Sequence, residues 1–144
     1  MIRALLDVNV WIALLDDAHV FSERANAWLR AEVAAIATCP IVENGVLRIM
    51  CSPAYSREIK VTPGDVAAHL RKVCAQLDHE FWPDDLSLRE EARFDFSRLH
   101  GHRQITDAYL LALALAHDGR LVTLDSAVPL TAVRGAARKH LLKI

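Results

Sequence analysis

The sequence predicts an α/β fold of three layers, in which helices cover both faces of a central, mainly parallel sheet. Segments with helical spacing of apolar residues alternate along the chain with short strand-like segments. The strand-like segments, such as "RALLD" and "RLVTLD", are continuously apolar up to their last residue, which is typical of strands buried on both faces. No internal repeat or linker interrupts the pattern, so we expect a single domain over residues 1–144.

In the first half of the chain we expect a strand over residues 3–7 and helices over 9–16 and 23–34. A strand over 35–39 and a helix over 40–51 follow. The first helix has Trp11, Leu14 and Leu15 on one side. Ser22 is a favoured N-cap for the second helix. Pro40 is a favoured first residue for the third.

In the second half we expect a helix over residues 62–77, a strand over 79–83, and helices over 88–96 and 107–118. A strand over 120–125, a short helical piece over 132–139 and a final strand over 140–144 follow. Thr62-Pro63 opens the first of these helices. A polar loop over 97–105 leads to Thr106, the expected N-cap of the apolar helix "DAYLLALALAHD", and Gly119 is expected to end that helix in a left-handed conformation.

The composition fits a globular, soluble protein, with 53% hydrophobic and 24% charged residues. Three widely spaced cysteines without a CxxC pair argue against a disulfide framework and favour a reducing compartment. We find no signal peptide and no segment long enough to span a membrane, and therefore expect a cytoplasmic location. A protein that holds nucleic acid by neutralising phosphates over a wide surface is usually clearly basic, whereas this chain has a net charge of −1. We therefore expect any nucleic acid to be handled at one local site.

Four acidic residues follow predicted strands or begin predicted helices. Asp7 and Asp125 come directly after strands, whereas Glu43 and Asp107 lie in the first turns of helices. Because ligands bind outside the carboxyl ends of parallel strands, these side chains are expected to meet in one cleft. Carboxylates gathered in this way repel one another unless cations neutralise them. An oxygen-rich set selects a hard divalent ion, Mg²⁺ or Mn²⁺.

Each acid also has a purely structural interpretation. Asp107 and Glu43 would each favour the dipole of the helix they begin, and Asp125 would open the turn "DSAVP" through side-chain hydrogen bonds. Asp7 is the hardest to explain in this way, because its neighbours are apolar and burying an unpaired charge is costly. The four acids together are therefore more informative than any one of them.

The stretches "LLDVNVWIALL", "TCPIVENGVLRIM" and "HRQITDAYLLALALAHDGRLVTLD" together resemble PIN-domain ribonucleases, and more narrowly the VapC-type toxins of bacterial VapBC toxin–antitoxin pairs. The match spans essentially the whole chain in the expected order, although residues 52–95 carry no motif that informs function. The acidic cluster of that family corresponds to the four acids named above. Asn9 and Thr123 match the small polar positions that flank the first and last of them.

The resemblance implies a metal-dependent endoribonuclease in which activated water cleaves RNA phosphodiester bonds. Asp7, Asp107 and Asp125 are the expected Mg²⁺ site, with Asp7 and Asp107 in direct contact. Asp125 and Glu43 would complete the coordination through water or orient the attacking water. Asn9 would hold Asp7 by hydrogen bonding, and Thr123 would do the same for Asp125.

The resemblance also implies partners: an RNA substrate, a VapB-type antitoxin, a homodimer, and a heterotetramer or larger assembly with the antitoxin. Apolar residues that could contact such a partner are Phe21, Trp28 and Leu29 on one helix and Leu47 and Met50 near the expected cleft. An arginine of the antitoxin would be able to enter the acidic cleft.

Two alternatives come from other protein classes. A haloacid-dehalogenase-like phosphatase also begins with a strand ending in aspartate, but it needs a second aspartate where this chain has Asn9. A non-enzymatic, receiver-like signalling domain would use an acidic pair such as Asp16-Asp17, yet these residues follow a helix and not a strand.

Overall fold

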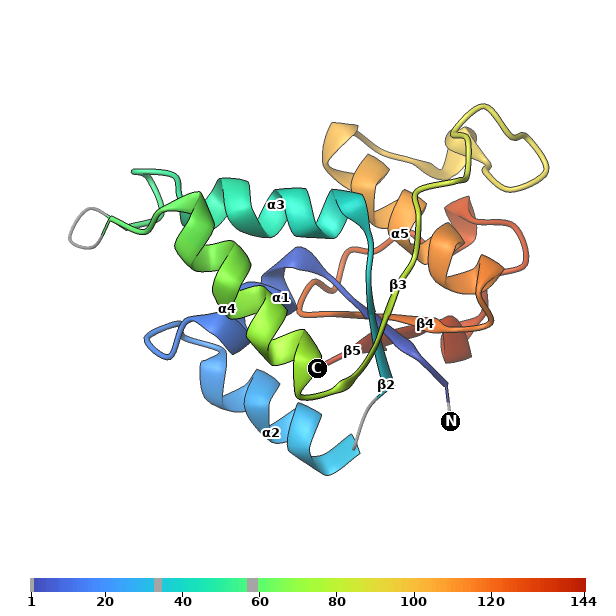
Figure 1. Ribbon diagram of the computed structural model, residues 1–144. Helices are drawn as coiled ribbons and strands as arrows, with labels where there is room; N and C mark the ends of the chain where they lie inside the picture. Colours follow the sequence, from blue (N-terminus) through green and yellow to red (C-terminus); the bar gives the residue numbers. More distant parts are fainter. Residues whose placement is uncertain (1, 33–34, 57–59) are drawn as a thin grey trace.

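A computed structural model describes residues 2–32, 35–56 and 60–144 of the chain (Figure 1). Within these residues, five parallel strands form one sheet in the order β3-β2-β1-β4-β5. The strands are β1 (Ala4–Leu6), β2 (Ala35–Thr38), β3 (Asp78–Phe81), β4 (Arg120–Thr123) and β5 (Leu141–Lys143). Every strand predicted from the sequence is therefore present, and the sheet is parallel throughout.

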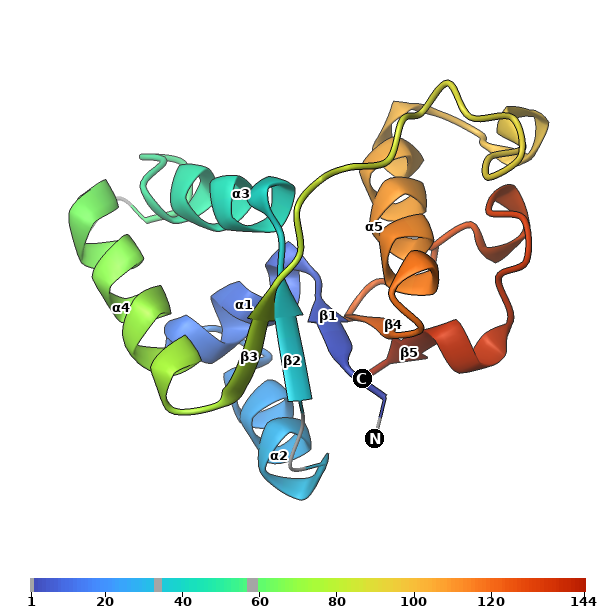
Figure 2. The same cartoon turned by 45° about the vertical axis from the view of Figure 1, so that its right-hand side comes forward.

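Helices cover both faces of this sheet, which confirms the predicted three layers. The helices are α1 (Val8–Leu15), α2 (Ser22–Glu32), α3 (Pro40–Met50), α4 (Pro63–Ala75) and α5 (Ile105–Ala116). The first four lie on one side of the sheet, and α5 lies on the other (Figure 2). Short 3₁₀ turns accompany α5: η1 (Phe96–Arg98), η2 (His102–Gln104), η3 (Leu130–Ala132) and η4 (Arg138–His140). No helix of the described residues has the length and apolar character needed to cross a membrane.

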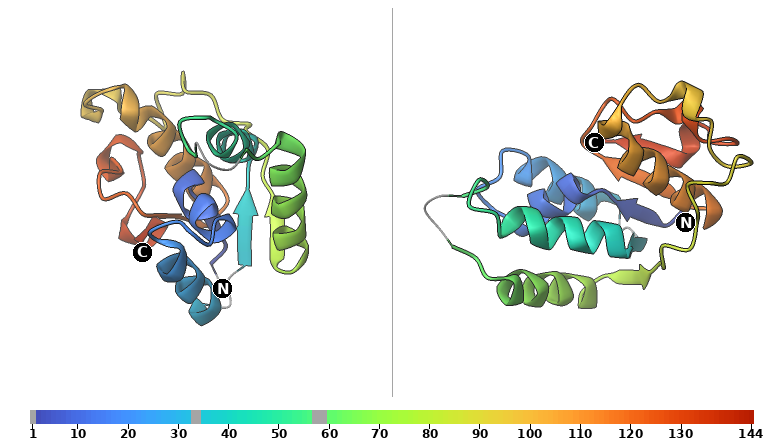
Figure 3. Two further views of the ribbon diagram at one scale, coloured as in Figure 1. Left: turned by 90° about the vertical axis from the view of Figure 1, so that its left-hand side faces the viewer. Right: turned by 90° about the horizontal axis from the view of Figure 1, so that it is seen from above.

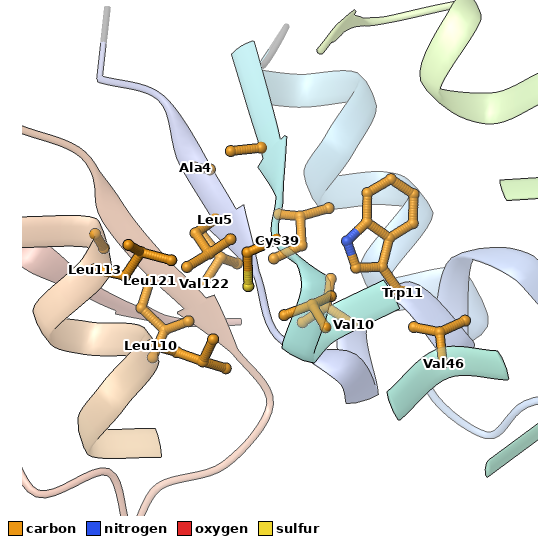
Figure 4. Close-up of a cluster of buried hydrophobic side chains, with 14 of the residues drawn as sticks. Ala4, Leu5, Val10, Trp11, Cys39, Val46, Leu110, Leu113, Leu121 and Val122 are labelled. Carbon is orange, nitrogen blue, oxygen red and sulfur yellow. The ribbon is translucent and has the colours of Figure 1, made fainter. Parts of the chain in front are cut away.

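The core lies where α1 and α5 meet opposite faces of the sheet (Figure 4). Trp11 and Val10 of α1 are fully buried on one side, and Leu110 and Leu113 of α5 are fully buried on the other. Trp11, Leu14 and Leu15, which the sequence places on one side of this helix, are buried, and so is every other residue from Val10 to Leu15. α1 is enclosed because it packs against α2 and α3 as well as against the sheet.

Three helix-terminus predictions were wrong in detail. Ser22 is the first residue of α2 and not its N-cap, a shift of one position. Thr106 lies inside α5, because η2 leads into the helix and Gln104 already has a helical backbone. After α5 the left-handed residue is Asp118, with φ 53°, and not Gly119. A Cβ at Gly119 would lie 2.7 Å from the Arg3 carbonyl oxygen, so glycine is required there by close packing.

The helix predicted over 88–96 is absent. Of the helical piece predicted over 132–139, only the two ends are helical, in the 3₁₀ turns η3 and η4, and residues 133–137 are not. The two segments bind each other instead: Phe94 and Val133 form an antiparallel bridge. The backbone N–H of Asp95 donates to the Ala132 carbonyl at 2.8 Å, and that of Arg134 donates to the Arg93 carbonyl at 2.8 Å. These long-range bonds use backbone groups that a helix would need, so tertiary pairing overrides local helix propensity.

The parallel sheet brings distant segments to one edge. All the strands end at the same edge, and α5, which runs back across the sheet before β4, begins there (Figure 3). The strand order reverses between β1 and β4, because the chain builds outward from β1 to β3 and then returns to the other side of β1. In open parallel sheets ligands bind at such a reversal.

Candidate active site

A cavity of about 590 Å³ opens at this strand-order reversal. Asp7 at the end of β1, Asp125 after β4 and Asp107 in the first turn of α5 all line it. The opposite wall belongs to α3 and contributes Asn44 and Arg48. The structure thus brings three of the four predicted acids into one cleft.

Asp7 is buried and held by two hydrogen bonds. It is the N-cap of α1, and its Oδ1 accepts the backbone N–H of Val8 at 2.7 Å. Its Oδ2 accepts the hydroxyl of Thr123 at 2.8 Å. Burial raises the pKa of Asp7; the bonds from Thr123 and Val8 oppose this, and the charge of Asp125 adds to it. The Asp7 carboxylate is therefore buried, as the sequence predicts, and its two hydrogen bonds fix its orientation.

Thr123 links the two strand-end acids. Its side chain is fully buried at the end of β4. Its hydroxyl donates to Asp7 and accepts the backbone N–H of Asp125 at 3.0 Å. Thr123 thus binds the backbone of Asp125 and not, as had been expected, its carboxylate. The carboxylate that Thr123 orients is that of Asp7. Asp125 also accepts the Ala127 N–H at 2.8 Å, so the predicted turn bond is present as well.

Asp107 is half-buried, and its carboxylate has no hydrogen bond or ion pair within the described part of the chain. Burial, followed by the negative charges of Asp7 and Asp125, raises the pKa of Asp107 to about 6. Each of these causes disfavours the ionised form, and none of the basic side chains that the structure describes forms an ion pair with Asp107. A bound cation would therefore favour the ionised form of Asp107.

Two predicted site residues lie differently from the expectation. Asn9 lines the cleft but is exposed, and in the described structure its side chain makes no hydrogen bond to Asp7, whose oxygens are occupied by Val8 and Thr123. Glu43 does not line the cleft with the other acids. Its side chain faces a neighbouring groove between α3 and α4 and accepts the hydroxyl of Thr38 at 2.7 Å.

One acid of the cleft was missed from the sequence. Asp84 follows β3, lines the same cavity, and accepts the backbone N–H of Ile41 in the first turn of α3 at 2.9 Å. Its other oxygen, Oδ1, is buried and has no hydrogen-bond partner within the described residues. The available signal was an acid shortly after a strand, in "HEFWPDD", the same signal that identified Asp7.

The oxygen donors of the cleft fit a hard divalent cation. The Asp107 carboxylate is uncompensated and close enough to Asp7 and Asp125 for their charges to raise its pKa. Across the described residues, no three acidic, His or Cys side chains are arranged to enclose a metal by themselves. Mg²⁺ commonly retains several waters and uses one or two protein carboxylates, which this arrangement satisfies.

Comparison with known proteins agrees with this geometry. The PIN domain family matches residues 4–133. Ribonuclease VapC44 of Mycobacterium tuberculosis (strain H37Rv) is 47% identical over 144 residues, covering 96% of this chain and 97% of the relative. Ribonuclease VapC29 of the same strain is 42% identical over 126 residues, covering 85% of each chain.

A solved structure, VapBC2 from Rickettsia felis bound to a DNA fragment from their promoter, shares the fold. Its TM-score is 0.52 at 18% identity, covering 87% of this chain and 89% of that one. These matches place the chain in neither of the two alternative classes considered from the sequence, the haloacid-dehalogenase-like phosphatases and the receiver-like domains. The chain belongs to the PIN domain family.

Proposed function

We propose that this chain is a metal-dependent endoribonuclease and the toxin of a type II toxin–antitoxin pair. The observation that carries the proposal is the uncompensated Asp107 carboxylate beside Asp7 and Asp125 at the strand-order reversal. The relatives named ribonucleases cover nearly the whole chain, which supports RNA as the substrate. We further propose a cytoplasmic location and a single domain over residues 1–144.

In this proposal Asp7, Asp107 and Asp125 are the residues that would hold Mg²⁺, with Mn²⁺ as a substitute; Asp7 and Asp107 would contact the ion directly, and Asp125 would act through water. When bound, the ion lowers the pKa of a coordinated water and stabilises charge on the leaving oxygen. Thr123 keeps the Asp7 carboxylate turned toward the cleft. Arg48 and Arg103 line the cleft, are exposed, and offer donors to the RNA phosphates.

Glu43 stands beside this cleft in the groove between α3 and α4. The groove shares Pro40, Asn44 and Arg48 with the cleft, so the two cavities adjoin. We propose that Glu43 orients the attacking water or substrate from this side, without binding the ion directly.

Cleavage of RNA by the purified chain tests the activity. With Mg²⁺ the wild-type chain should cleave, and excess EDTA or Asp7→Asn should abolish cleavage while the far-UV circular dichroism spectrum stays unchanged. A matched control, Asp118→Asn, replaces an aspartate outside the cleft and should leave the rate unaltered. Full activity in EDTA, or in the Asp7→Asn protein, would refute the mechanism.

We also propose a VapB-type antitoxin as partner, a homodimer of this chain, and a heterotetramer or larger assembly of the two. Phe21 is exposed at the start of α2, and Leu47 lines the groove beside Glu43, so both are available to a partner. Met50 is buried in the core and is not available. The uncompensated carboxylates would accept an arginine from the antitoxin in place of the metal.

A further inference from the structure

Glu43 is held by a chain of two hydrogen bonds that crosses from α3 to β3. The hydroxyl of Thr38, the last residue of β2, lies 2.7 Å from Glu43 Oε2. The same hydroxyl lies 2.7 Å from Nε2 of His79, which belongs to the neighbouring strand β3. Thr38 is fully buried, so water does not compete for its hydroxyl.

The chemistry of these groups fixes the direction of both bonds. An ionised carboxylate only accepts hydrogen bonds, so the single hydroxyl hydrogen of Thr38 points to Glu43. The Thr38 oxygen must then accept from His79, which requires a hydrogen on Nε2. Burial lowers the pKa of His79; the charges of Glu43 and Glu80 oppose this, and that of Arg3 adds to it. A neutral ring with its hydrogen on Nε2 satisfies all three groups.

This chain of bonds lies at a groove that adjoins the acidic cleft. Glu43 and His79 line the groove between α3 and α4, which has a volume of about 950 Å³. The residue after Glu43, Asn44, lines both the groove and the acidic cleft. A glutamate side chain that is free in solution samples many rotamers, whereas here its terminal oxygen is bound to a buried group of the sheet.

We propose that Thr38 and His79 are positioning residues for Glu43, holding its carboxylate in one orientation in the groove beside the cleft before RNA binds. The inference rests on the proposed function, because it assigns Glu43 a part in cleavage. Thr38 and His79 themselves touch neither the metal site nor the substrate; they act through Glu43.

The decisive test is a double-mutant cycle on cleavage of an RNA oligonucleotide with saturating Mg²⁺. Thr38→Val keeps the shape of the side chain and removes the hydroxyl, so kcat should fall about 10- to 100-fold, the range seen when a group that orients a site residue is lost. KM should stay within about twofold, because the lost contact orients a catalytic group and not the bound RNA. Thr38→Ser should restore most of kcat, and Glu43→Gln/Thr38→Val should be no slower than Glu43→Gln alone.

Thr131→Val is the matched control, since Thr131 is exposed and lines neither cavity. Thermal unfolding of each variant verifies that it is folded. ¹⁵N chemical shifts of the His79 ring should show the hydrogen on Nε2 in the wild type. The proposal is overturned by additive losses in the double mutant, by undiminished kcat in Thr38→Val, or by a neutral His79 carrying its hydrogen on Nδ1.

The outcomes also separate this inference from the proposed function. Loss of cleavage in Asp7→Asn together with full activity in Glu43→Gln would support the nuclease proposal and would overturn the positioning role of Thr38 and His79. Full activity in Asp7→Asn would refute the nuclease mechanism itself.

Discussion

Single residues determine the electrostatics of the cleft. Asp7 is buried but bonded by Thr123 and Val8, whereas Asp107 is half-buried and receives no hydrogen bond or cation from the described residues. Burial and the charges of Asp7 and Asp125 therefore raise the pKa of Asp107 to about 6. The uncompensated Asp107 carboxylate destabilises the metal-free fold at neutral pH and supports the proposed cation site.

Replacing Asp107 should stabilise the metal-free protein in a pH-dependent way. The folded state holds the Asp107 proton more tightly than the unfolded chain, so this group favours folding below pH 3.8 and the benefit disappears as the pH rises through about 6. Asp107→Asn removes that loss and should raise the free energy of unfolding by up to about 3 kcal/mol at pH 7.5, and by much less at pH 4.5.

Urea denaturation in EDTA at the two pH values measures this difference. Added Mg²⁺ should stabilise the wild type more than Asp107→Asn, because the variant has lost a ligand. An equal gain in the free energy of unfolding at both pH values would show that the raised pKa of the Asp107 carboxylate is not the source of the stabilisation.

The sequence was sufficient to place those site residues whose position follows from where a strand ends or a helix begins. Asp7 and Asp125 end apolar strands and Asp107 begins a helix, and a parallel sheet brings such positions together. The partners of Asn9 and Glu43 were not predictable, because they depend on side-chain directions at the cleft. Thr38 and His79, which hold Glu43, come from strands whose pairing the sequence does not state.

At the scale of elements, the segment after β3 connects the two walls of the cleft. Asp84 accepts the N–H of Ile41 at the start of α3. The backbone N–H of Leu86 donates to the hydroxyl of Tyr109 in α5 at 3.4 Å. The segment passes over the edge of the sheet from α3 toward α5 (Figure 2). It therefore fixes the α3 wall, which bears Arg48, relative to the α5 wall, which bears Asp107.

Substitutions of Asp84 distinguish capping from charge. Asp84→Ala removes the acceptor for the Ile41 N–H and should lower the free energy of unfolding by about 1 kcal/mol, as for the loss of a helix cap. Asp84→Asn keeps an acceptor oxygen and should retain most of the stability and RNA cleavage. Denaturation and cleavage assays on the same samples measure both. If Asp84→Asn loses as much activity as Asp84→Ala, the charge of Asp84 acts in the cleft directly.

Elements were predictable where local signals agree with the fold. Thr62 and Asp65 form the capping box that begins α4, and Pro40 begins α3, as their sequence positions indicate. Residues 88–96 have helical spacing but pair with residues near Val133 instead. That pairing joins segments far apart in sequence, so no local pattern reveals it.

At the scale of the whole molecule, the order β3-β2-β1-β4-β5 creates the site. It places β1 and β4 side by side, so that Asp7 and Asp125 emerge at one edge. The alternation of strands and helices predicts a parallel sheet covered on both faces, but several strand orders are compatible with it. The sequence therefore predicts that the acids at strand ends and helix starts meet in one cleft, but the strand pair that forms the cleft was known only from the structure.

The proposed antitoxin should silence the nuclease when it binds. Co-expression with the product of the adjacent small gene should yield a stable complex, and RNA cleavage by that complex should be strongly reduced because the partner occupies the acidic cleft. Pull-down followed by the cleavage assay measures both properties. A product that binds without lowering activity, or that does not bind, would contradict the toxin–antitoxin proposal and leave the nuclease proposal standing.

We propose that Asp7, Asp107 and Asp125 together form the site of a divalent metal ion. Anomalous diffraction at the manganese edge, from crystals equilibrated with Mn²⁺, locates the ion without reference to activity. We expect an anomalous peak within coordination distance of the Asp7 and Asp107 carboxylates, with Asp125 reached directly or through one water. A peak elsewhere, or no peak at saturating Mn²⁺, would contradict the account.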